Sequence, residues 1–429
     1  MKANLDELKK SIRMRLVEEL GAEITAPDRP VDPDRARNIL TNFIASERTP
    51  LSAADKLQLS EDILDDVLGY GPIEKYLKDP EVTEIMINGP DTVYIERFGL
   101  IEETDTCFIN DQQLRRVIDK IVSRIGRRID ESTPMVDARL PDGSRVNVII
   151  PPLALDGAVM TIRKFSADPL TVEDLVRFGT LTEPTVEFLR ACVRGRLNII
   201  VSGGTGTGKT TTLNVLSSFI PASDRVVTIE DAAELQLKQK HVIRLESRPA
   251  NIEGRGQVTI RELLRNALRM RPDRIVVGEA RGGEAFDMLQ AMNTGHDGSL
   301  STVHCNSPRD ALARVETMVL MAGLELPPRA IREQISSALD LIIHLARLGD
   351  GSRRVTQISE VQGLENEIIT MQDIFTFDFS MGIDETGRYL GRLKGTGIRP
   401  QFMAKLAEHA IELPAEVFAY EQPEPVRQQ

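Results

Sequence analysis

The chain has 429 residues, of which 41% are hydrophobic and 28% are charged. These proportions indicate a soluble globular protein, and the length predicts two to four domains. The formal net charge of −12 and the aromatic content of 4%, with no tryptophan, disfavour a surface that binds or stacks on nucleic acid. We therefore expect no nucleic-acid partner.

Cysteine usage and hydropathy predict the compartment. Cys107, Cys192 and Cys305 lie far apart and match neither a zinc-binding spacing nor a disulfide framework, which indicates a reducing cytoplasm. No stretch approaches the ~18 consecutive apolar residues of a membrane span, and the first residues lack the apolar region of a signal peptide. The prediction is a cytoplasmic protein, neither exported nor inserted, that reaches a membrane only through partners.

Residues 1–72 are expected to form a helical domain. Leu5, Leu8, Ile12 and Leu16 recur at spacings of three and four, as on the apolar face of an amphipathic helix. Prolines at positions 27, 30 and 33 interrupt this pattern. The expected helices are 4–20, about 34–47, and 52 to about 69.

Residues 73–165 have a different character, typical of an α+β domain. Short alternating segments predict strands, and one longer amphipathic segment predicts a helix. The expected strands are 84–88, 92–96, 145–150 and 158–163, and the expected helix is 111–127. Residues 166–172 are expected to be a hinge.

Residues 173–415 alternate between helices and short apolar strands, which predicts an α/β fold with a doubly wound parallel sheet. The expected strands are 197–201, 226–230, 274–278 and 299–304, with shorter ones near 341–345, 355–361 and 366–370. The expected helices are about 184–194, 209–218, 259–270, 282–293, 308–322 and 328–339. The Pro- and Glu-rich segment 416–429 is expected to be a flexible tail.

Residues 203–210 match the pattern G-x-x-x-x-G-K-[ST] of a phosphate-binding loop. Its glycines let backbone N–H groups approach phosphates, its lysine reaches the β- and γ-phosphates, and its last hydroxyl binds Mg²⁺. A strand, the loop and a helix follow in the required order, so a ligand-free glycine-rich turn is the weaker alternative. The expected nucleotide-binding residues are Gly203, Gly204, Thr205, Gly206, Thr207, Gly208, Lys209, Thr210 and Thr211, with Thr210 also a metal ligand.

Two further strands end in carboxylates. Glu279 follows the strand at 274–278, where a carboxylate in such a fold orders Mg²⁺ and its waters, here more plausibly through a water. Glu230 ends the strand at 226–230 and can orient or deprotonate the attacking water. Asp231 and Glu234 are expected at most to support Glu230 in this role. The alternative for each is a solvated carboxylate at a strand end or a helix start.

Two histidines and three arginines complete the candidates. His296 and His304 lie in the third strand–helix unit, where they can sense the γ-phosphate, although a lone histidine on a strand is more often structural. Arg139, Arg145 and Arg163 lie in the preceding domain, where surface arginines are normally solvated. Phosphoryl transfer needs a cation from outside the loop, which a hinged domain can deliver on closing.

These motifs resemble the motor ATPases of bacterial secretion systems and type IV pili. Four boxes carry the resemblance, in the family's order from about residue 70 to about 370: residues 203–210, 228–235, 274–281 and 295–304. The helical extension and the stretch Arg139–Asn147 are most similar to the CpaF-type ATPase of tight-adherence (Tad) pili. The chain departs from many type II secretion members because it has no cysteine-rich zinc insert.

The resemblance implies a homohexameric ring of subunits, each with an α/β domain hinged to a RecA-like ATPase domain. It implies that Glu230 belongs to an acidic box that activates water and that Glu279 is the Walker B acid and a metal ligand. His296 and His304 would form a histidine box. Arg145 and Arg163 would contact phosphates, with Arg139 as a less secure nucleotide contact.

We therefore expect a motor that hydrolyses ATP with Mg²⁺ and drives pilus assembly, with possible retraction, through an inner-membrane platform protein. A type IV or type II secretion ATPase is the first alternative. A DNA helicase or recombinase shares the RecA-like fold, but the acidic charge argues against it. A degenerate ATPase used as a scaffold is the least favoured alternative, because Lys209, Thr210, Glu230 and Glu279 are all present.

Overall fold

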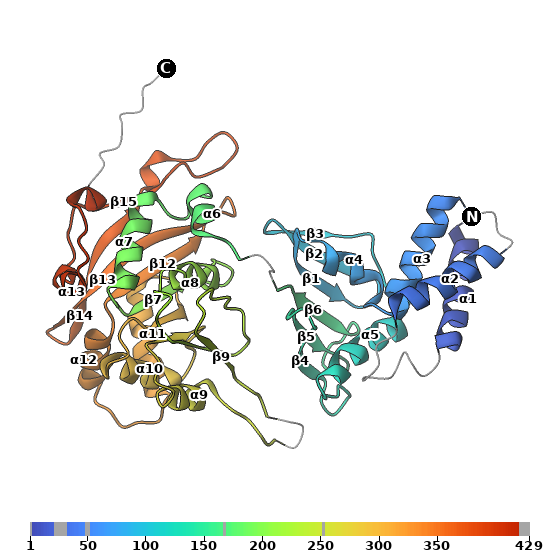
Figure 1. Cartoon of the computed structure of the whole chain (residues 1–429), viewed down its shortest axis with the longest axis horizontal. Coiled ribbons are helices and arrows are strands. Elements are labelled where there is room, and N and C mark those ends of the chain that lie inside the picture. The colour runs from blue at the N-terminus through green and yellow to red at the C-terminus, as the bar shows by residue number, and fades with distance from the viewer. Residues whose placement is uncertain (1, 21–31, 48–51, 166–168, 251–253, 420–429) are drawn as a thin grey trace. The chain divides into compact units, whose positions relative to one another are not determined.

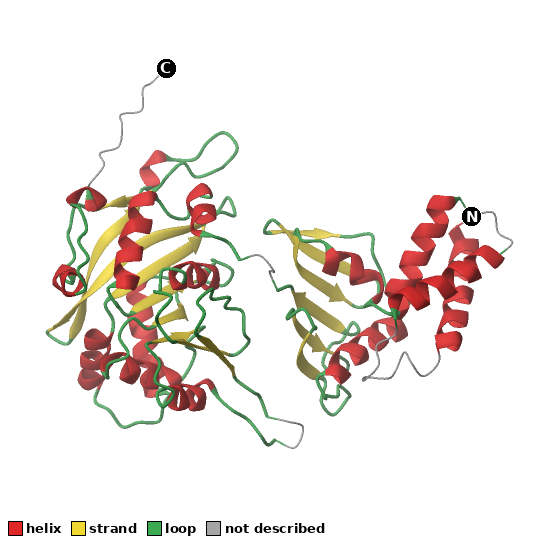
Figure 2. Cartoon of the chain, in the orientation of Figure 1, coloured by secondary structure: helices red, strands yellow, loops and turns green. Residues whose placement is uncertain are grey.

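The computed structural model describes residues 2–20, 32–47, 52–165, 169–250 and 254–419. Contacts divide the chain into two compact units, residues 1–167 and 168–429. The division falls inside the segment 166–172 that we expected to be a hinge, and its hinge action remains a prediction. Figure 1 shows the elements in chain order, and Figure 2 shows helices and strands by type.

A three-helix bundle begins the first unit. It consists of α1 (Lys2–Leu20), α2 (Pro33–Ser46) and α3 (Ala53–Val67). One apolar stripe of each helix is buried in a common core that includes Ile12, Leu40 and Ile63. Ser52 caps α3, because its side chain accepts a hydrogen bond from the backbone N–H of Asp55. The Asp55 side chain in turn accepts a hydrogen bond from the backbone N–H of Ser52, which completes a capping box.

The rest of the first unit is a six-stranded sheet with strand order β3-β2-β1-β6-β5-β4. Its strands are β1 (Val82–Asn88), β2 (Thr92–Arg97), β3 (Leu100–Glu103), β4 (Met135–Arg139), β5 (Arg145–Ile149) and β6 (Val159–Arg163), and all neighbours run antiparallel. The unit also contains η2 (Gly71–Ile73), α4 (Glu74–Lys78) and α5 (Asp111–Arg124). The apolar side chains of α5 pack on one sheet face together with inward residues such as Ile85 and Val148.

One lysine joins the bundle to this sheet domain. The Nζ of Lys120, on α5, donates to the backbone oxygens of Val67, Leu68 and Gly69, at 3.4, 2.7 and 2.9 Å. These are carbonyls at the C-terminal end of α3, which the helix itself leaves without partners. A cation there also suits the helix dipole. The contact therefore holds α3 against α5.

The second unit contains a nine-stranded sheet with strand order β15-β14-β13-β12-β7-β11-β10-β8-β9. The strands from β12 to β9 in this order are parallel, and β13, β14 and β15 are antiparallel. Their bounds are β7 (Ile199–Gly203), β8 (Val226–Glu230), β9 (Val242–Glu246), β10 (Arg274–Val277), β11 (Leu300–His304), β12 (Leu341–Arg347), β13 (Arg353–Glu365), β14 (Ile368–Phe377) and β15 (Leu393–Gly395).

Helices cover both faces of this sheet (Figure 2), as we predicted for a doubly wound fold. Strand residues alternate between two cores: Ile199 and Val201 face the core of α7 and α8, whereas Ile200 faces that of α9 to α12. The helices are α6 (Val172–Arg177), α7 (Glu183–Arg194), α8 (Lys209–Ser217), α9 (Ile260–Ala267), α10 (Glu284–Asn293), α11 (Pro308–Leu320), α12 (Pro328–Ala338) and α13 (Met403–Glu408), with short η3 (Phe379–Met381) and η4 (Ala415–Phe418).

Several expected boundaries were wrong. The strand expected at 197–201 is β7, two residues later, because the backbone N–H of Asn198 donates to Asp340 Oδ2 at 2.8 Å instead of to a neighbouring strand. The strand expected at 366–370 starts at Ile368 and runs to Phe377. The first residues of the expected tail belong to the fold, since Val417 and Phe418 are buried in η4 and Phe418 packs edge-on against Phe188, whereas residues 420–429 lie outside the described residues. Strands β3, β4, β9 and β15 were not anticipated, because short or half-exposed strands leave a weak apolar pattern.

Candidate functional site

The phosphate-loop motif lies between the carboxyl end of β7 and the first turn of α8. Gly208 has φ +93° and Gly203 has φ +154°, both in the region that favours glycine. A Cβ atom at Gly203 would lie 2.5 Å from the backbone oxygen of Leu345 and 2.7 Å from Thr207 Oγ1, so a side chain does not fit there. Thr205 and Gly206 are exposed at the tip, and Thr210 and Thr211 are half-buried at the start of α8. The N-terminus of α8 is thus placed as an anion site requires.

Lys209 is buried and lies next to a histidine. Its Nζ donates to the backbone oxygen of Gly204, inside the loop, at 2.7 Å, and lies 3.4 Å from His304 Nδ1. The two residues meet because His304 ends β11, which is paired with β7 so that His304 is opposite Gly203. Burial lowers the pKa of His304, and the charge of Lys209 lowers it further. The charge of Glu279 acts in the opposite direction, and the net effect favours the neutral form of His304.

Glu279 joins the same cluster through His304 and an arginine. Gly278 follows β10 and donates its N–H to the backbone oxygen of Ile229, which places the next residue at the carboxyl edge of the sheet. Glu279 Oε2 accepts a hydrogen bond from Arg281 Nη2 at 2.6 Å. Its Oε1 lies 3.0 Å from His304 Nε2, without the angles of a hydrogen bond, and is buried. Lys209, His304 and Glu279 thus form one chain of contacts.

Glu230 is buried at the end of β8, directly beside Gly278. Its Oε2 accepts hydrogen bonds from the backbone N–H groups of Glu234 and Leu235 at 2.8 and 3.0 Å, and its Oε1 has no hydrogen-bond partner in the described chain. Burial raises the pKa of Glu230 to about 7. A Cβ atom at position 278 would lie 2.8 Å from Glu230 Cγ, which explains why glycine stands where the usual aspartate would be.

These groups fit a nucleotide-bound Mg²⁺. In the described chain, buried oxygen atoms without hydrogen-bond partners remain on both Glu230 and Glu279, and Thr210, the second residue of α8, carries the hydroxyl of the motif. Carboxylate and hydroxyl oxygens are the donors that this hard cation prefers. Among the described residues, no group of three or more His, Cys, Asp or Glu side chains is placed to hold a metal ion.

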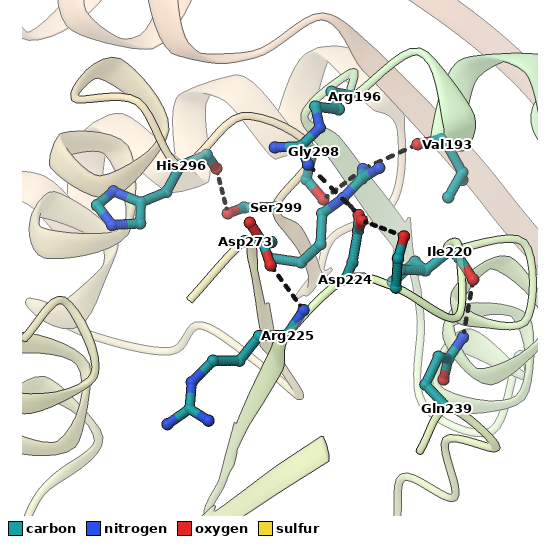
Figure 3. A network of polar contacts seen from close by, with 12 residues as sticks. Val193, Arg196, Ile220, Asp224, Arg225, Gln239, Asp273, His296, Gly298 and Ser299 are labelled. Carbon is teal, nitrogen blue, oxygen red and sulfur yellow. Dashed lines mark hydrogen bonds and ion pairs between the residues drawn. The ribbon is translucent and has the colours of Figure 1, made fainter. Parts of the chain in front are cut away.

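The structure does not bring His296 to this cluster. His296 lies before β11, at the amino end of the strands, and His304 lies at the carboxyl end. The five-residue strand between them corresponds to about 13 Å. In Figure 3, His296 lies beside Ser299, whose hydroxyl donates to its backbone oxygen at 2.8 Å, in the same region as Asp224 and Asp273. The two histidines that we grouped in one box therefore face different ends of the sheet within a subunit.

A buried ion pair stabilises that amino end. Arg274 is fully buried, and its Nε donates to Asp224 Oδ2 at 2.9 Å, while its Nη1 donates to the backbone oxygen of Val193 at 2.8 Å. Gly298 has φ +82°, and a Cβ atom there would overlap the Arg274 guanidinium. This network (Figure 3) fixes the ends of β8, β10 and the segment before β11 to one another.

The three candidate arginines of the first unit lie in one row. In the antiparallel register, Arg139 of β4 is directly opposite Arg145 of β5, and Arg145 is directly opposite Arg163 of β6. Their strand neighbours Ala138, Val146 and Ile162 are buried on the α5 side, so the arginines project from the other face. Like charges directly opposite each other destabilise a sheet. Arg163 is in turn directly opposite Glu84 of β1, whose charge offsets part of the row. Three arginines opposite one carboxylate give the row a net positive charge, which suits an anionic ligand.

Two arginines near the loop were missed by the sequence analysis. Arg281 lies within the third box and contacts Glu279, and it also lies 3.7 Å from Asp231. Its position two residues after Glu279 was a usable signal. Arg353, at the start of β13, donates from Nε to the backbone oxygen of Gly206 at 2.8 Å. No local motif identifies Arg353, because a distant hairpin brings it to the loop.

In the part of the chain that the structure describes, every helix is too short or too polar to cross a membrane.

Comparisons with known proteins agree with the motifs. A family model described as "Type II/IV secretion system protein" matches residues 66–380. A putative conjugal transfer protein of Mycobacterium tuberculosis is 34% identical over 309 residues, which cover 71% of this chain and 87% of that protein. The type IV secretion system protein VirB11 of Brucella suis is 33% identical over 318 residues, which cover 68% of this chain and 88% of that protein.

A solved structure is also similar. The crystal structure of the VirB11 ATPase from the Brucella suis type IV secretion system, in complex with sulphate, is 30% identical in sequence and covers 67% of this chain and 91% of that chain. Its TM-score is 0.37. The weight of the comparison therefore lies in the sequence matches.

Proposed function

Because the chain belongs to the family of type II/IV secretion system proteins, we propose that it is a motor ATPase that hydrolyses ATP with Mg²⁺. One observation carries the proposal: Lys209 in its phosphate loop lies in one cluster with His304 and Glu279, beside the buried Glu230. A lysine for phosphate, carboxylates for metal and water, and a helix N-terminus are the parts that phosphoryl transfer to water needs.

Each residue has a defined task in this mechanism. Lys209 exchanges the Gly204 carbonyl for the β- and γ-phosphate oxygens when nucleotide binds. Thr210 and Glu279 would hold Mg²⁺, which would supply neutralisation of the phosphate charge. Glu230, with a pKa of about 7, is poised near the working pH to accept a proton from the attacking water. His304, whose pKa is lowered by burial and by the charge of Lys209, lies between Lys209 and Glu279, so its contacts change when either residue engages the ligand.

The arginine row supplies the positive charge that phosphoryl transfer needs from outside the phosphate loop. We place Arg145 and Arg163 on the γ-phosphate when nucleotide is bound, with Arg139 beside them. Their contact would make ATP favour one arrangement of the two units, and hydrolysis would remove that preference. The segment 166–172 would then serve as the hinge. This coupling is what converts a chemical step into movement.

The finer assignment is a homohexameric Tad-type pilus motor of the CpaF class at the inner face of the inner membrane. Its partner would be a platform protein in that membrane. The Arg139–Asn147 stretch and the helical extension favour this assignment. A type IV secretion ATPase is the second candidate, favoured by the similarity to VirB11 and to a putative conjugal transfer protein. A gene neighbourhood with prepilins favours the first, and one with channel components favours the second.

The test of the proposal is Lys209→Ala in the full-length protein. We expect phosphate release from ATP to fall by at least ~100-fold, since the variant loses the only loop side chain that reaches both phosphates. Lys240→Ala, at an exposed position, is the matched control and should keep wild-type turnover. Circular dichroism should show the same fold in both variants. Unchanged turnover in Lys209→Ala would reject the assignment.

The arginine row has a separate test in the same assay. Arg145→Ala and Arg163→Ala should bind ADP as the wild type does, because ADP lacks the γ-phosphate that the row contacts. They should hydrolyse ATP at least ~10-fold more slowly, because the charge that develops on the γ-phosphate loses its stabilisation. Wild-type turnover in both variants would reject the role of the row while leaving the role of Lys209 intact.

A further inference from the structure

The hairpin between β12 and β13 extends beyond the carboxyl edge of the sheet, beside the phosphate loop. β12 pairs with β7 up to Leu345, which is opposite Gly203, and then continues to Arg347. A tight turn follows, in which the Leu348 N–H donates to the Ser352 backbone oxygen at 2.8 Å, and the Asp350 carboxylate accepts from the Ser352 N–H at 2.9 Å. The turn holds the first residue of β13 next to the loop.

That first residue is Arg353, and it contacts the outside of the loop. Its Nε donates to the backbone oxygen of Gly206 at 2.8 Å, and its Cδ lies 3.6 Å from where a Cβ of Gly208 would be. A phosphate-binding loop points its N–H groups inward, so its carbonyl groups point outward and need donors there. Arg353 provides such a donor at the loop tip.

The same hairpin strand also holds the turn that follows α6. The Thr180 hydroxyl donates to the backbone oxygen of Arg353 at 2.7 Å, and the Val355 N–H donates to the backbone oxygen of Thr180 at 3.3 Å. The Arg354 guanidinium donates to the backbone oxygen of Phe178. Thr180 is buried, so its contact is shielded from water. α6 begins at Val172, just after the division between the two units.

We propose that Arg353 is a positioning residue that connects the phosphate loop to the α6 turn. The side chain of Arg353 holds the loop tip through Gly206, and its backbone holds Thr180, so one residue joins the nucleotide site to the start of the second unit. When nucleotide binding orders the loop, this connection also stabilises residues 172–181. This role rests on the proposed nucleotide binding, and it adds a residue and a route that the motifs do not contain.

The first experiment uses the nucleotide-free, full-length protein, so it does not depend on the proposed function. In Arg353→Ala, hydrogen exchange of the loop peptide 203–213 should be several-fold faster than in the wild type, because Gly206 loses its outer donor. Arg353→Lys should recover part of the protection, and Arg399→Ala, at an exposed arginine of the same unit, should change nothing. Wild-type exchange in Arg353→Ala would overturn the inference.

The second experiment adds ADP and needs no turnover. In a titration with a fluorescent ADP analogue, Arg353→Ala should bind about 5–10-fold more weakly than the wild type, consistent with loss of one solvent-exposed hydrogen bond. Thr180→Val, which keeps the side-chain shape, should bind ADP within about twofold of the wild type but lose the ADP-dependent protection of residues 172–181. Absence of this ADP-dependent protection in the wild type would overturn the proposed connection between the loop and the α6 turn.

A wild type that binds no ADP would refute the proposed function instead. The first experiment would then still decide the role of Arg353.

Discussion

The two ends of the second-unit sheet both contain buried charged side chains. At one end the charge has a counter-charge within the chain, and at the other it has none. At the amino end, Arg274 and Asp224 form a direct ion pair at 2.9 Å, so the charge is balanced within the chain. At the carboxyl end, Glu230 is equally buried but has no ion-pair partner in the described chain, only two backbone N–H donors. Its pKa is correspondingly raised to about 7.

This difference separates structure from function. A balanced buried pair fixes strand ends and gives no site for a ligand. Each end leaves one buried atom without a hydrogen-bond partner in the described chain, Arg274 Nη2 at the amino end and Glu230 Oε1 at the carboxyl end, so the difference lies in the charge. A buried carboxylate without a counter-charge is costly to the folded state, and such groups persist where a ligand uses them. The comparison thus assigns the amino end to stability and the carboxyl end to chemistry, and it can be tested by neutralising one acid at each end.

The largest effect on stability is expected for Asp224→Asn. The substitution leaves the Arg274 charge buried without its counter-charge, which should destabilise the unit by about 3–5 kcal/mol. Hydrogen exchange of the β8 and β10 amides in the full-length protein measures this loss. Glu385→Gln, at an exposed acid, is the control and should have no measurable effect. A loss of stability below about 1 kcal/mol would contradict the stabilising role that the comparison assigns to the amino end of the sheet.

Glu230→Gln is expected to change stability in the opposite direction, by making the folded state more stable at high pH. The pKa of Glu230 rises from about 4.5 to about 7 on folding, so the folded state binds more protons than the unfolded state between these values. The stabilisation is therefore fully present below pH 4.5 and is lost as the pH rises to 7, a change of about 3 kcal/mol. The variant should remove this pH dependence and be more stable than the wild type at pH 8, while turnover falls at least ~10-fold.

The same exchange measurement at pH 5 and pH 8 checks this prediction, after correction for the intrinsic exchange rate. Its control is again Glu385→Gln, which should keep the wild-type pH dependence. If Glu230→Gln were less stable than the wild type at pH 8, then the Glu230 carboxylate would be balanced in place, as Asp224 is, and the contrast between the two ends would fail.

The smallest effect distinguishes the two histidines. His304→Asn removes the group between Lys209 and Glu279 and should lower turnover about 10-fold, or ~1.4 kcal/mol in the activation barrier. His296→Asn, at the other end of β11, should change it less than about twofold. His409→Asn, at an exposed position, is the control for both. An equal loss for His296 and His304 would show that both act on the same nucleotide, contrary to their separation along β11.

Local patterns in the sequence determined most of the elements and the central motif. Apolar periodicity indicated the helices and the buried strands, because a 3.6-residue or two-residue repeat is visible within a short window. Residues 203–210 were identified with the strand and helix on either side, although β7 lies two residues later than expected. Strand-end carboxylates pointed to Glu230 and Glu279 because parallel strands end at one edge of the sheet.

Only the tertiary structure decided which of these residues meet. The contact of His304 with Lys209 depends on the register of β11 against β7, and the separation of His296 depends on the direction of β11. The arginine row depends on the register of β4, β5 and β6, and the contact of Arg353 with Gly206 joins residues 147 positions apart. Strand register and hairpin placement arise from packing across the whole sheet, so no short stretch of sequence contains them.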